Sequence, residues 1–210
     1  MKLLSYDGPL AQTIRLVWRY FVLNLCFIIC SLPIITIGAT LSALFTVMLP
    51  IPEDTAYIKK FFSAFRSNFS QATIIWLIIL IPLSLLLFCL YLTLTISFPG
   101  HVLFRTIDLV LLIILMSLVS YVFPLQARYD NPPKTTVRNA FILCIGALLP
   151  GLLMSLITLI PVFTFIISID LFVRLISLWP FIGFSLTARL NSVICMYVFS
   201  RLDPPKTDVE

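Results

Sequence analysis

The sequence predicts an all-α, polytopic integral membrane helical bundle of about five to six transmembrane segments, with an N-terminal helical hairpin and a cytoplasmic amphipathic elbow helix. Hydrophobic residues make up 60% of the chain and charged residues only 11%, far from the composition of soluble domains. Long apolar runs alternate with short polar segments, one of which carries phenylalanines at helical spacing. Residues 1–202 then form a single transmembrane domain, and residues 203–210 form a short disordered cytoplasmic tail.

The first apolar run extends from about residue 16 to residue 33 and is long enough for a spanning helix if the arginines near its start reach the surface. A second run, residues 35–50, is short for a full crossing, and it either spans or re-enters. We interpret residues 16–50 as a tight helical hairpin. Small residues at i, i+4 spacing allow its backbone to approach a neighbouring helix, and these helix-packing residues are Gly38, Ala39, Ser42 and Ala43.

The segment KKFFSAFRSNFSQA, residues 59–72, predicts a helix that lies in the headgroup plane. Its aromatic rings share one face, which points toward the acyl chains, and its cations fall away from that face. The segment is too polar to span the membrane. It is either an elbow that leads into the next span or a docking surface for a partner, and the residues of this candidate interaction surface are Lys59, Lys60, Phe61, Phe62, Phe65, Arg66, Asn68 and Phe69.

Two long spanning helices are expected next, at residues 73–98 and 102–124. Pro82 predicts a kink in the first of them. A polar loop with an Asn-Pro-Pro break, residues 125–138, ends this part of the chain.

The last part of the chain predicts one span, one return helix and one final segment that carries several polar side chains. The span at residues 139–159 is interrupted by Pro150 and its neighbouring glycine. Pro161 marks the next reversal, and the return helix extends to about Pro180. Residues 181–202 carry several polar side chains, so we expect them to be amphipathic or packed on the bundle, and the pattern does not predict that they cross.

The basic residues predict the orientation, because loops on the cytoplasmic side retain lysine and arginine. If the hairpin returns to the side it left, twelve of the fourteen lie on one side. We therefore expect both termini to be cytoplasmic, in a multi-pass protein of the plasma membrane. The twelve residues are Lys2, Arg15, Arg19, Lys59, Lys60, Arg66, Arg128, Lys134, Arg138, Arg189, Arg201 and Lys206.

Polar residues inside the membrane are the best candidates for a functional site, because ionisable groups there are costly. Asp170 and Arg174 have i, i+4 spacing, which allows them to pair on one face near the middle of the expected return helix. They are either a structural ion pair or part of a solute path. Asn24 and Thr36 are either hydrogen-bonding contacts within the hairpin or ligands of a site.

Other functional classes find no support in the residue pattern. The chain has no nucleophile motif with a base, no Gly-rich phosphate loop and no carboxylates paired on one face, so we expect neither an enzyme nor a cofactor. Its five cysteines lie in apolar runs without a C-x-x-C pair, which predicts neither disulfides nor a metal site. The net charge of +5 is dispersed among apolar segments and does not predict a nucleic-acid partner.

Several short motifs together resemble the YesL family, a bacterial membrane family also catalogued as domain of unknown function 624. The resemblance covers almost the whole chain. The residues that carry it are Asn24, S-L-P-x-x-T-x-G-A at 31–39 with Ala43 and Leu44, F-F-x-x-F-R-x-N-F-x-Q-A at 61–72, F-P-L-x-A-R at 123–128 and R-N-A at 138–140.

The resemblance implies a bacterial plasma membrane and an accessory role in carbohydrate uptake, because members of that family are often encoded beside carbohydrate-uptake ABC transporters. Three hypotheses stay open. The protein is an accessory subunit that contacts sugar ABC transporter permease subunits or another membrane protein, a copy of itself included. It is a small secondary transporter of a sugar or related solute. Or it is a membrane scaffold or regulator without a solute path.

Overall fold

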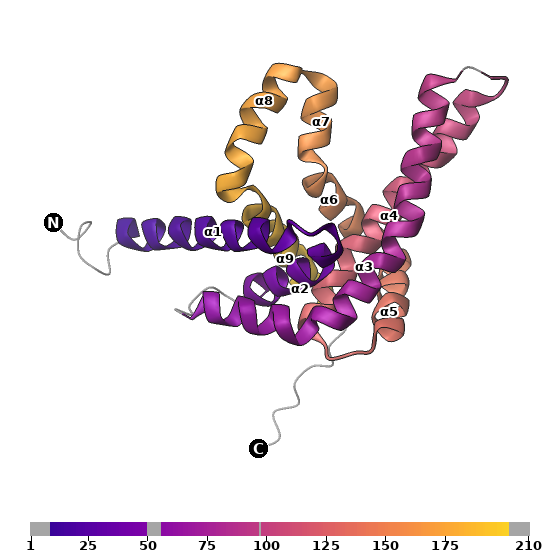
Figure 1. The fold of residues 1–210 in the computed structure, drawn as a ribbon. Helices are drawn as coiled ribbons and strands as arrows, with labels where there is room; N and C mark the ends of the chain where they lie inside the picture. Colours follow the sequence, from indigo (N-terminus) through magenta and orange to yellow (C-terminus); the bar gives the residue numbers. More distant parts are fainter. Residues whose placement is uncertain (1–8, 50–55, 97, 202–210) are drawn as a thin grey trace.

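The computed structural model describes residues 9–49, 56–96 and 98–201, and all regular elements within these ranges are helical (Figure 1). The expected tail, residues 203–210, lies outside the described residues. In chain order the elements are α1 (Pro9–Ser31), η2 (Ile34–Thr36), α2 (Ile37–Met48), α3 (Tyr57–Thr95), α4 (His101–Arg128), α5 (Pro133–Gly146), α6 (Leu148–Thr158), α7 (Ile160–Ile167), α8 (Ile169–Leu178), η3 (Trp179–Gly183) and α9 (Phe184–Ser200).

Four helical runs in the described ranges are long and apolar enough to cross a membrane. They are Ala11–Ser31, Tyr57–Thr95, His101–Arg128 and Ile169–Ser200. The pair α5 and α6 would add a fifth if counted as one broken span. The structure thus has four or five candidate spans, whereas the sequence predicted five to six, so the two agree only at five. Four or five apolar spans both indicate a multi-pass membrane protein.

Helix α2 is short and lies at the centre of the bundle. Its 12 residues extend over about 18 Å at 1.5 Å per residue, against about 30 Å of hydrocarbon in a bilayer. Nine of the 12 are buried, and the helix packs chiefly against α3, with further contacts to α4, α9 and α1. The second arm of the expected hairpin is therefore a core helix.

Helix α3 unites the expected elbow and the following span in 39 continuous residues. Its first part runs across one end of the bundle, and its second part rises beside α4 (Figure 1). The helix continues through Pro82, which lies inside it. We call residues 57–72 of this helix the elbow.

The break in the expected span at 139–159 lies at Ala147, not at Pro150. Helices α5 and α6 are bent by 103° relative to each other there, and Ala147 has φ −130° and ψ 52°. Pro150 occupies the first turn of α6, where a backbone N–H has no partner within the helix, so proline does no harm.

The expected reversal at Pro161 is also wrong. Pro161 lies in the first turn of α7, and the chain reverses at Ser168, which has an extended backbone between α7 and α8. The two helices form an outward-projecting pair on the same side of the bundle as α3 and α4 (Figure 1). A π-helical turn, η3, then connects α8 to α9. Helix α9 packs on the bundle as expected, but with α8 and η3 it forms an apolar run long enough to cross a membrane, which the residue pattern did not predict.

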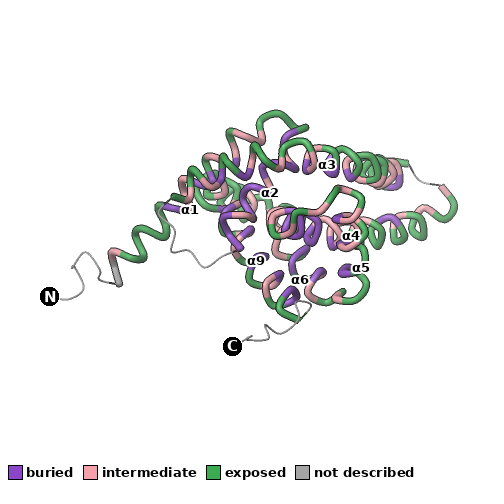
Figure 2. Tube along the Cα trace, turned by 90° about the horizontal axis from the view of Figure 1, so that it is seen from below, coloured by how far each residue is buried: buried purple, intermediate pink, exposed green. Residues whose placement is uncertain are grey.

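Buried residues concentrate where α2, α4, α6 and α9 meet, and the far parts of α3 and α4 are largely exposed (Figure 2). Isoleucine, leucine and phenylalanine dominate those exposed surfaces. Such a distribution suits a bundle whose outer surface contacts lipid chains.

Candidate functional site

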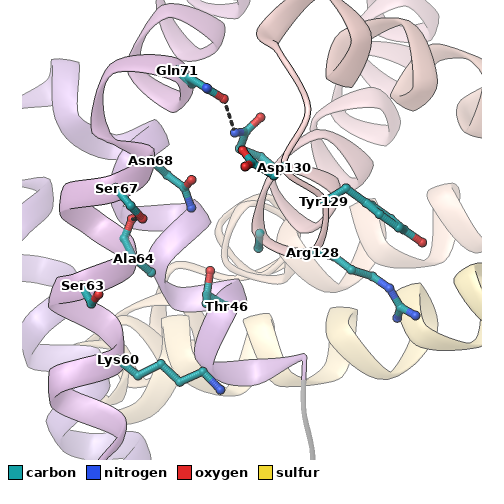
Figure 3. A pocket seen from close by; sticks show the side chains of 12 residues that line it. Thr46, Lys60, Ser63, Ala64, Ser67, Asn68, Gln71, Arg128, Tyr129 and Asp130 are labelled. Carbon is teal, nitrogen blue, oxygen red and sulfur yellow. Dashed lines mark hydrogen bonds between the residues drawn. The ribbon is translucent and has the colours of Figure 1, made fainter.

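A polar hollow of about 560 Å³ lies between the elbow and the end of α4 (Figure 3). Its walls carry amides, hydroxyls and charged groups, in contrast to the apolar surface around the spans. The lining residues are Thr46, Lys60, Ser63, Ala64, Ser67, Asn68, Gln71, Gln126, Ala127, Arg128, Tyr129 and Asp130.

Helical periodicity explains why the elbow supplies six of these residues. Positions 60, 63, 64, 67, 68 and 71 recur at three- and four-residue steps, so they share one face of α3. The opposite wall is the last turn of α4 and the residues after it. Tyr129, with φ −118° and ψ 134°, ends α4 and turns the chain toward α5.

Gln126 connects the floor of the hollow to two other helices. Its Nε2 donates to Gln71 Oε1 at 2.9 Å, the bond drawn in Figure 3, and its Oε1 accepts from Thr136 Oγ1 at 3.0 Å. On the elbow, Asn68 Nδ2 donates to Ser42 Oγ of α2 at 3.2 Å. These side-chain bonds hold α2, α3, α4 and α5 in one arrangement around the hollow.

Two cations and one carboxylate line the hollow. Lys60 comes from the elbow and Arg128 from the end of α4 (Figure 3). The Arg128 guanidinium lies over the rings of Tyr129 and Phe199, at 5.5 Å and 5.4 Å from their centroids. Asp130 is exposed. The formal charge of the lining is +1, which favours a polar or acidic occupant.

The structure divides the predicted interaction surface among three faces of the elbow. Phe61 is fully buried and Phe65 half-buried, both within the core. Lys60 and Asn68 face the hollow. The remaining residues form an exposed outer face together with Ile58, and this outer face consists of Ile58, Lys59, Phe62, Arg66 and Phe69.

The predicted packing residues Gly38, Ala39, Ser42 and Ala43 are all buried in α2. A Cβ at Gly38 would overlap the carbonyl oxygen of Ala72 and come within 2.5 Å of Trp76 Cβ. The small residues therefore bring α2 against α3 within the same chain.

Asn24 is fully buried and bonds to the junction between η3 and α9. Its Nδ2 donates to the carbonyls of Trp179 and Pro180 at 3.1 Å and 2.6 Å, and its Oδ1 accepts from the Ser185 N–H at 3.1 Å. The asparagine amide thus supplies a donor and an acceptor where the π-helical turn interrupts regular helix bonding.

Thr36 closes the turn between α1 and α2. Its hydroxyl lies within hydrogen-bonding distance of the carbonyls of Cys30 and Pro33, at 2.6 Å and 2.7 Å. The Cys30 carbonyl lies in the last turn of α1, where carbonyls lack a helical partner, and the Pro33 carbonyl also accepts from the Thr36 N–H at 2.9 Å. A structural contact accounts for both Asn24 and Thr36.

Asp170 and Arg174 lie apart from the hollow, on α8. Both side chains are exposed, and no ion pair joins them in the described part of the chain. The expected position midway along a helix from Pro161 to Pro180 was wrong, because the chain reverses at Ser168. Asp170 is instead in the first turn of α8, where a carboxylate complements the helix dipole.

Two arginines, Arg19 and Arg189, bind the C-terminal end of α2, a contact that the sequence pattern did not predict. Arg19 Nη2 donates to the Val47 carbonyl at 3.2 Å, and Arg189 Nη1 donates to the Met48 carbonyl at 2.7 Å. Both cations thus meet the negative end of the α2 dipole. Their residue type was visible in the sequence, but α1 and α9 are too far apart along the chain for a local pattern to pair them.

The elbow and the small-residue face of α2 also carry most of the motifs that resemble a known family. Residues 20–90 match the family model described as "Protein of unknown function, DUF624". The DUF624 domain is found in YesL-type membrane proteins, so the match confirms the resemblance to the YesL family over these residues.

The DUF624 match covers most of α1, all of α2 and α3 as far as Leu90, about a third of the chain. It includes the motifs at 31–39 and 61–72, whereas those at 123–128 and 138–140 lie beyond it. No curated protein and no solved structure matches the chain.

Proposed function

We propose that this protein is an accessory integral membrane protein of carbohydrate uptake in the bacterial plasma membrane, and that it acts by protein–protein contact. Its partners are permease subunits of a sugar ABC transporter. Both termini are cytoplasmic, and the elbow and the polar hollow are on the cytoplasmic side. The resemblance to the YesL family supports the role in carbohydrate uptake. The exposed outer face of the elbow supports action by protein–protein contact.

The observation that carries this proposal is the outer face of the elbow. Phe62 and Phe69 are 47% and 40% exposed, whereas Phe61, on the adjacent face of the same helix, is fully buried. Each outer ring contacts an inner ring, at centroid distances of 5.4 Å for Phe62 and Phe61 and 5.5 Å for Phe69 and Phe65, and its remaining surface is exposed. Aromatic rings next to Arg66 form a combination that is enriched at protein–protein contact sites.

A transport path has less support in the geometry. Asp170 and Arg174, which such a path would use, line neither the polar hollow nor the apolar cavity deeper in the bundle. The side chains of Asn24 and Thr36 form hydrogen bonds with backbone groups of the same chain. Contact with a partner therefore explains more of the exposed chemistry.

The proposal is tested by purifying the tagged protein in mild detergent from its native membrane and quantifying the sugar-permease subunits that accompany it. The double variant Phe62→Ala, Arg66→Ala should reduce their recovery about tenfold or more, since contact surfaces concentrate affinity in aromatic and arginine side chains. Phe88→Ala is the matched control, because Phe88 is an exposed phenylalanine farther along the same helix.

Two outcomes would contradict the proposal. Absence of permease subunits from the wild-type purification would remove the partner. Equal recovery with the wild type and the double variant at equal expression would mean that the outer face contacts only lipid. Phe61→Ala is unsuitable for this test, because Phe61 belongs to the core and its loss would change the fold.

A further inference from the structure

An apolar cavity of about 320 Å³ lies at the centre of the bundle, where seven of the α-helices and η3 meet. Its size lies in the range of small-molecule sites. All of its walls belong to apolar helices, and no charged side chain lines it. The lining residues are Phe27, Leu41, Leu44, Phe45, Met116, Val119, Ser120, Phe123, Thr158, Pro161, Ile176, Trp179, Phe184, Thr187, Ala188 and Asn191.

Two of the polar residues in this lining have used their only donor, and Asn191 has used one of the two N–H donors of its amide. Ser120 and Thr158 donate their hydroxyl protons to the carbonyls of Met116 and Met154, both at 2.9 Å. Asn191 Nδ2 donates to Thr158 Oγ1 at 3.0 Å. The two hydroxyl oxygens and Asn191 Oδ1 therefore retain the capacity to accept a hydrogen bond.

Asn191 Oδ1 is the acceptor that lacks a partner. The residue is only 4% exposed, and Oδ1 is buried without a hydrogen bond. A buried acceptor in apolar surroundings is unfavourable until a donor reaches it. Water filling the whole cavity would not resolve this, since its walls are mostly apolar.

We propose that the cavity binds a neutral, membrane-soluble aliphatic molecule whose hydroxyl group donates a hydrogen bond to Asn191 Oδ1. The apolar walls hold the aliphatic body, and the absence of charged groups from the lining excludes ionic headgroups. Molecules that only accept hydrogen bonds, such as ethers and esters, leave Oδ1 unsatisfied and bind less tightly. The ligand enters from the bilayer, because the lining residues lie within apolar helices.

Trp179 provides a reporter for this site, because its side chain lines the cavity. Gly183 makes room for the indole, since a Cβ there would overlap the ring. The other tryptophans, Trp18 and Trp76, do not line the cavity. A brominated ligand that enters the cavity therefore quenches Trp179 in preference to the others.

The experiment titrates bromodecanol, and separately its methyl ether, into the full-length protein in lipid nanodiscs while tryptophan fluorescence is recorded. We expect saturable quenching by the alcohol, with an affinity about five- to tenfold higher than that of the ether, as one additional hydrogen bond provides. Trp179→Phe should remove the saturable component and leave only the gradual quenching of Trp18 and Trp76.

Two variants address the polar and apolar parts of the site separately. Asn191→Leu should abolish the difference between alcohol and ether. Ala188→Leu, which adds volume at the cavity wall, should weaken both probes alike and keeps the test decisive if Asn191→Leu does not fold. Non-saturable quenching in the wild type would overturn the site. Equal affinity for alcohol and ether, or unchanged binding in Ala188→Leu, would overturn the assignment to Asn191 and to this cavity.

Discussion

At Gly38 the packing of α2 against α3 leaves no room for a side chain. The atoms that a new side chain would meet are the Ala72 carbonyl oxygen and Trp76 Cβ, which belong to or lie next to the helix backbone and cannot rotate away. Trp76 also donates its indole N–H to the Ile34 carbonyl at 2.8 Å, which fixes the same contact from the other side. One hydrogen atom in place of a methyl group thus sets the distance between two helices.

Gly38→Ala should lower the free energy of unfolding by about 1–3 kcal/mol, because overpacking forces the two backbones apart. Gly146→Ala is the matched control, since a Cβ there meets nothing within 4 Å. The control should stay within about 0.5 kcal/mol of the wild type. Denaturant titration of both variants in micelles measures the difference, and equal stability of the two would refute the close-contact interpretation.

At the scale of elements, Asn24 joins α1 to the irregular junction between α8 and α9. Residue Ser185 adds a second bond between the same elements, from its hydroxyl to the Tyr20 carbonyl at 2.9 Å. The π-helical turn can exist inside the bundle because α1 satisfies its backbone groups. Helices α1 and α9 are therefore stabilised together.

Asn24→Leu should remove three hydrogen bonds from backbone groups of this junction, at a cost of about 1–3 kcal/mol for each buried group left without a partner. Backbone hydrogen exchange should therefore accelerate at residues 181–188, in addition to a loss of overall stability. Leu25→Ala serves as the control, because Leu25 is exposed on the same helix. Unchanged exchange at Ser185 in Asn24→Leu would contradict the bridging role.

The elements also show what could be predicted from sequence and what could not. Small-residue spacing predicts that residues 38–43 pack closely on a neighbouring helix, and α2 lies against α3 at Gly38, but helix spacing contains no information on which helix is the neighbour. Prolines misled the boundaries, because Pro150 and Pro161 lie in first turns, where proline starts a helix as readily as it ends one. The hollow combines residues 60–71 with 126–130, a distance in sequence that no local pattern spans.

At the scale of the whole molecule, the polar hollow constrains how the chain is threaded. Lys60 and Arg128 line one hollow, so the elbow and the loop after α4 are on the same side of the membrane. The chain passes from α3 to α4 at the end of this helix pair that is far from the elbow (Figure 1). From the positive-inside rule we propose that the hollow faces the cytoplasm.

Cysteine substitutions at Ser63 and Pro99 test this threading, because both residues are exposed and lie at opposite ends. With a membrane-impermeant maleimide, Ser63→Cys should react only in inverted vesicles and Pro99→Cys only in right-side-out vesicles. The five native cysteines are half-buried or buried in apolar helices, so their background should be low. The reverse pattern would place the hollow outside the cell.

Polar contacts between the first and the last helices have a consequence for biosynthesis, and the Arg189 contact with the end of α2 is one of them. Met48 is synthesised 141 residues before its partner Arg189. Asn24 is synthesised 161 residues before its partner Ser185. During translation the first helices therefore carry polar groups whose partners have not yet been made. A nascent chain that stops before α9 would present these groups to lipid, which is the kind of defect that membrane quality-control proteases can detect.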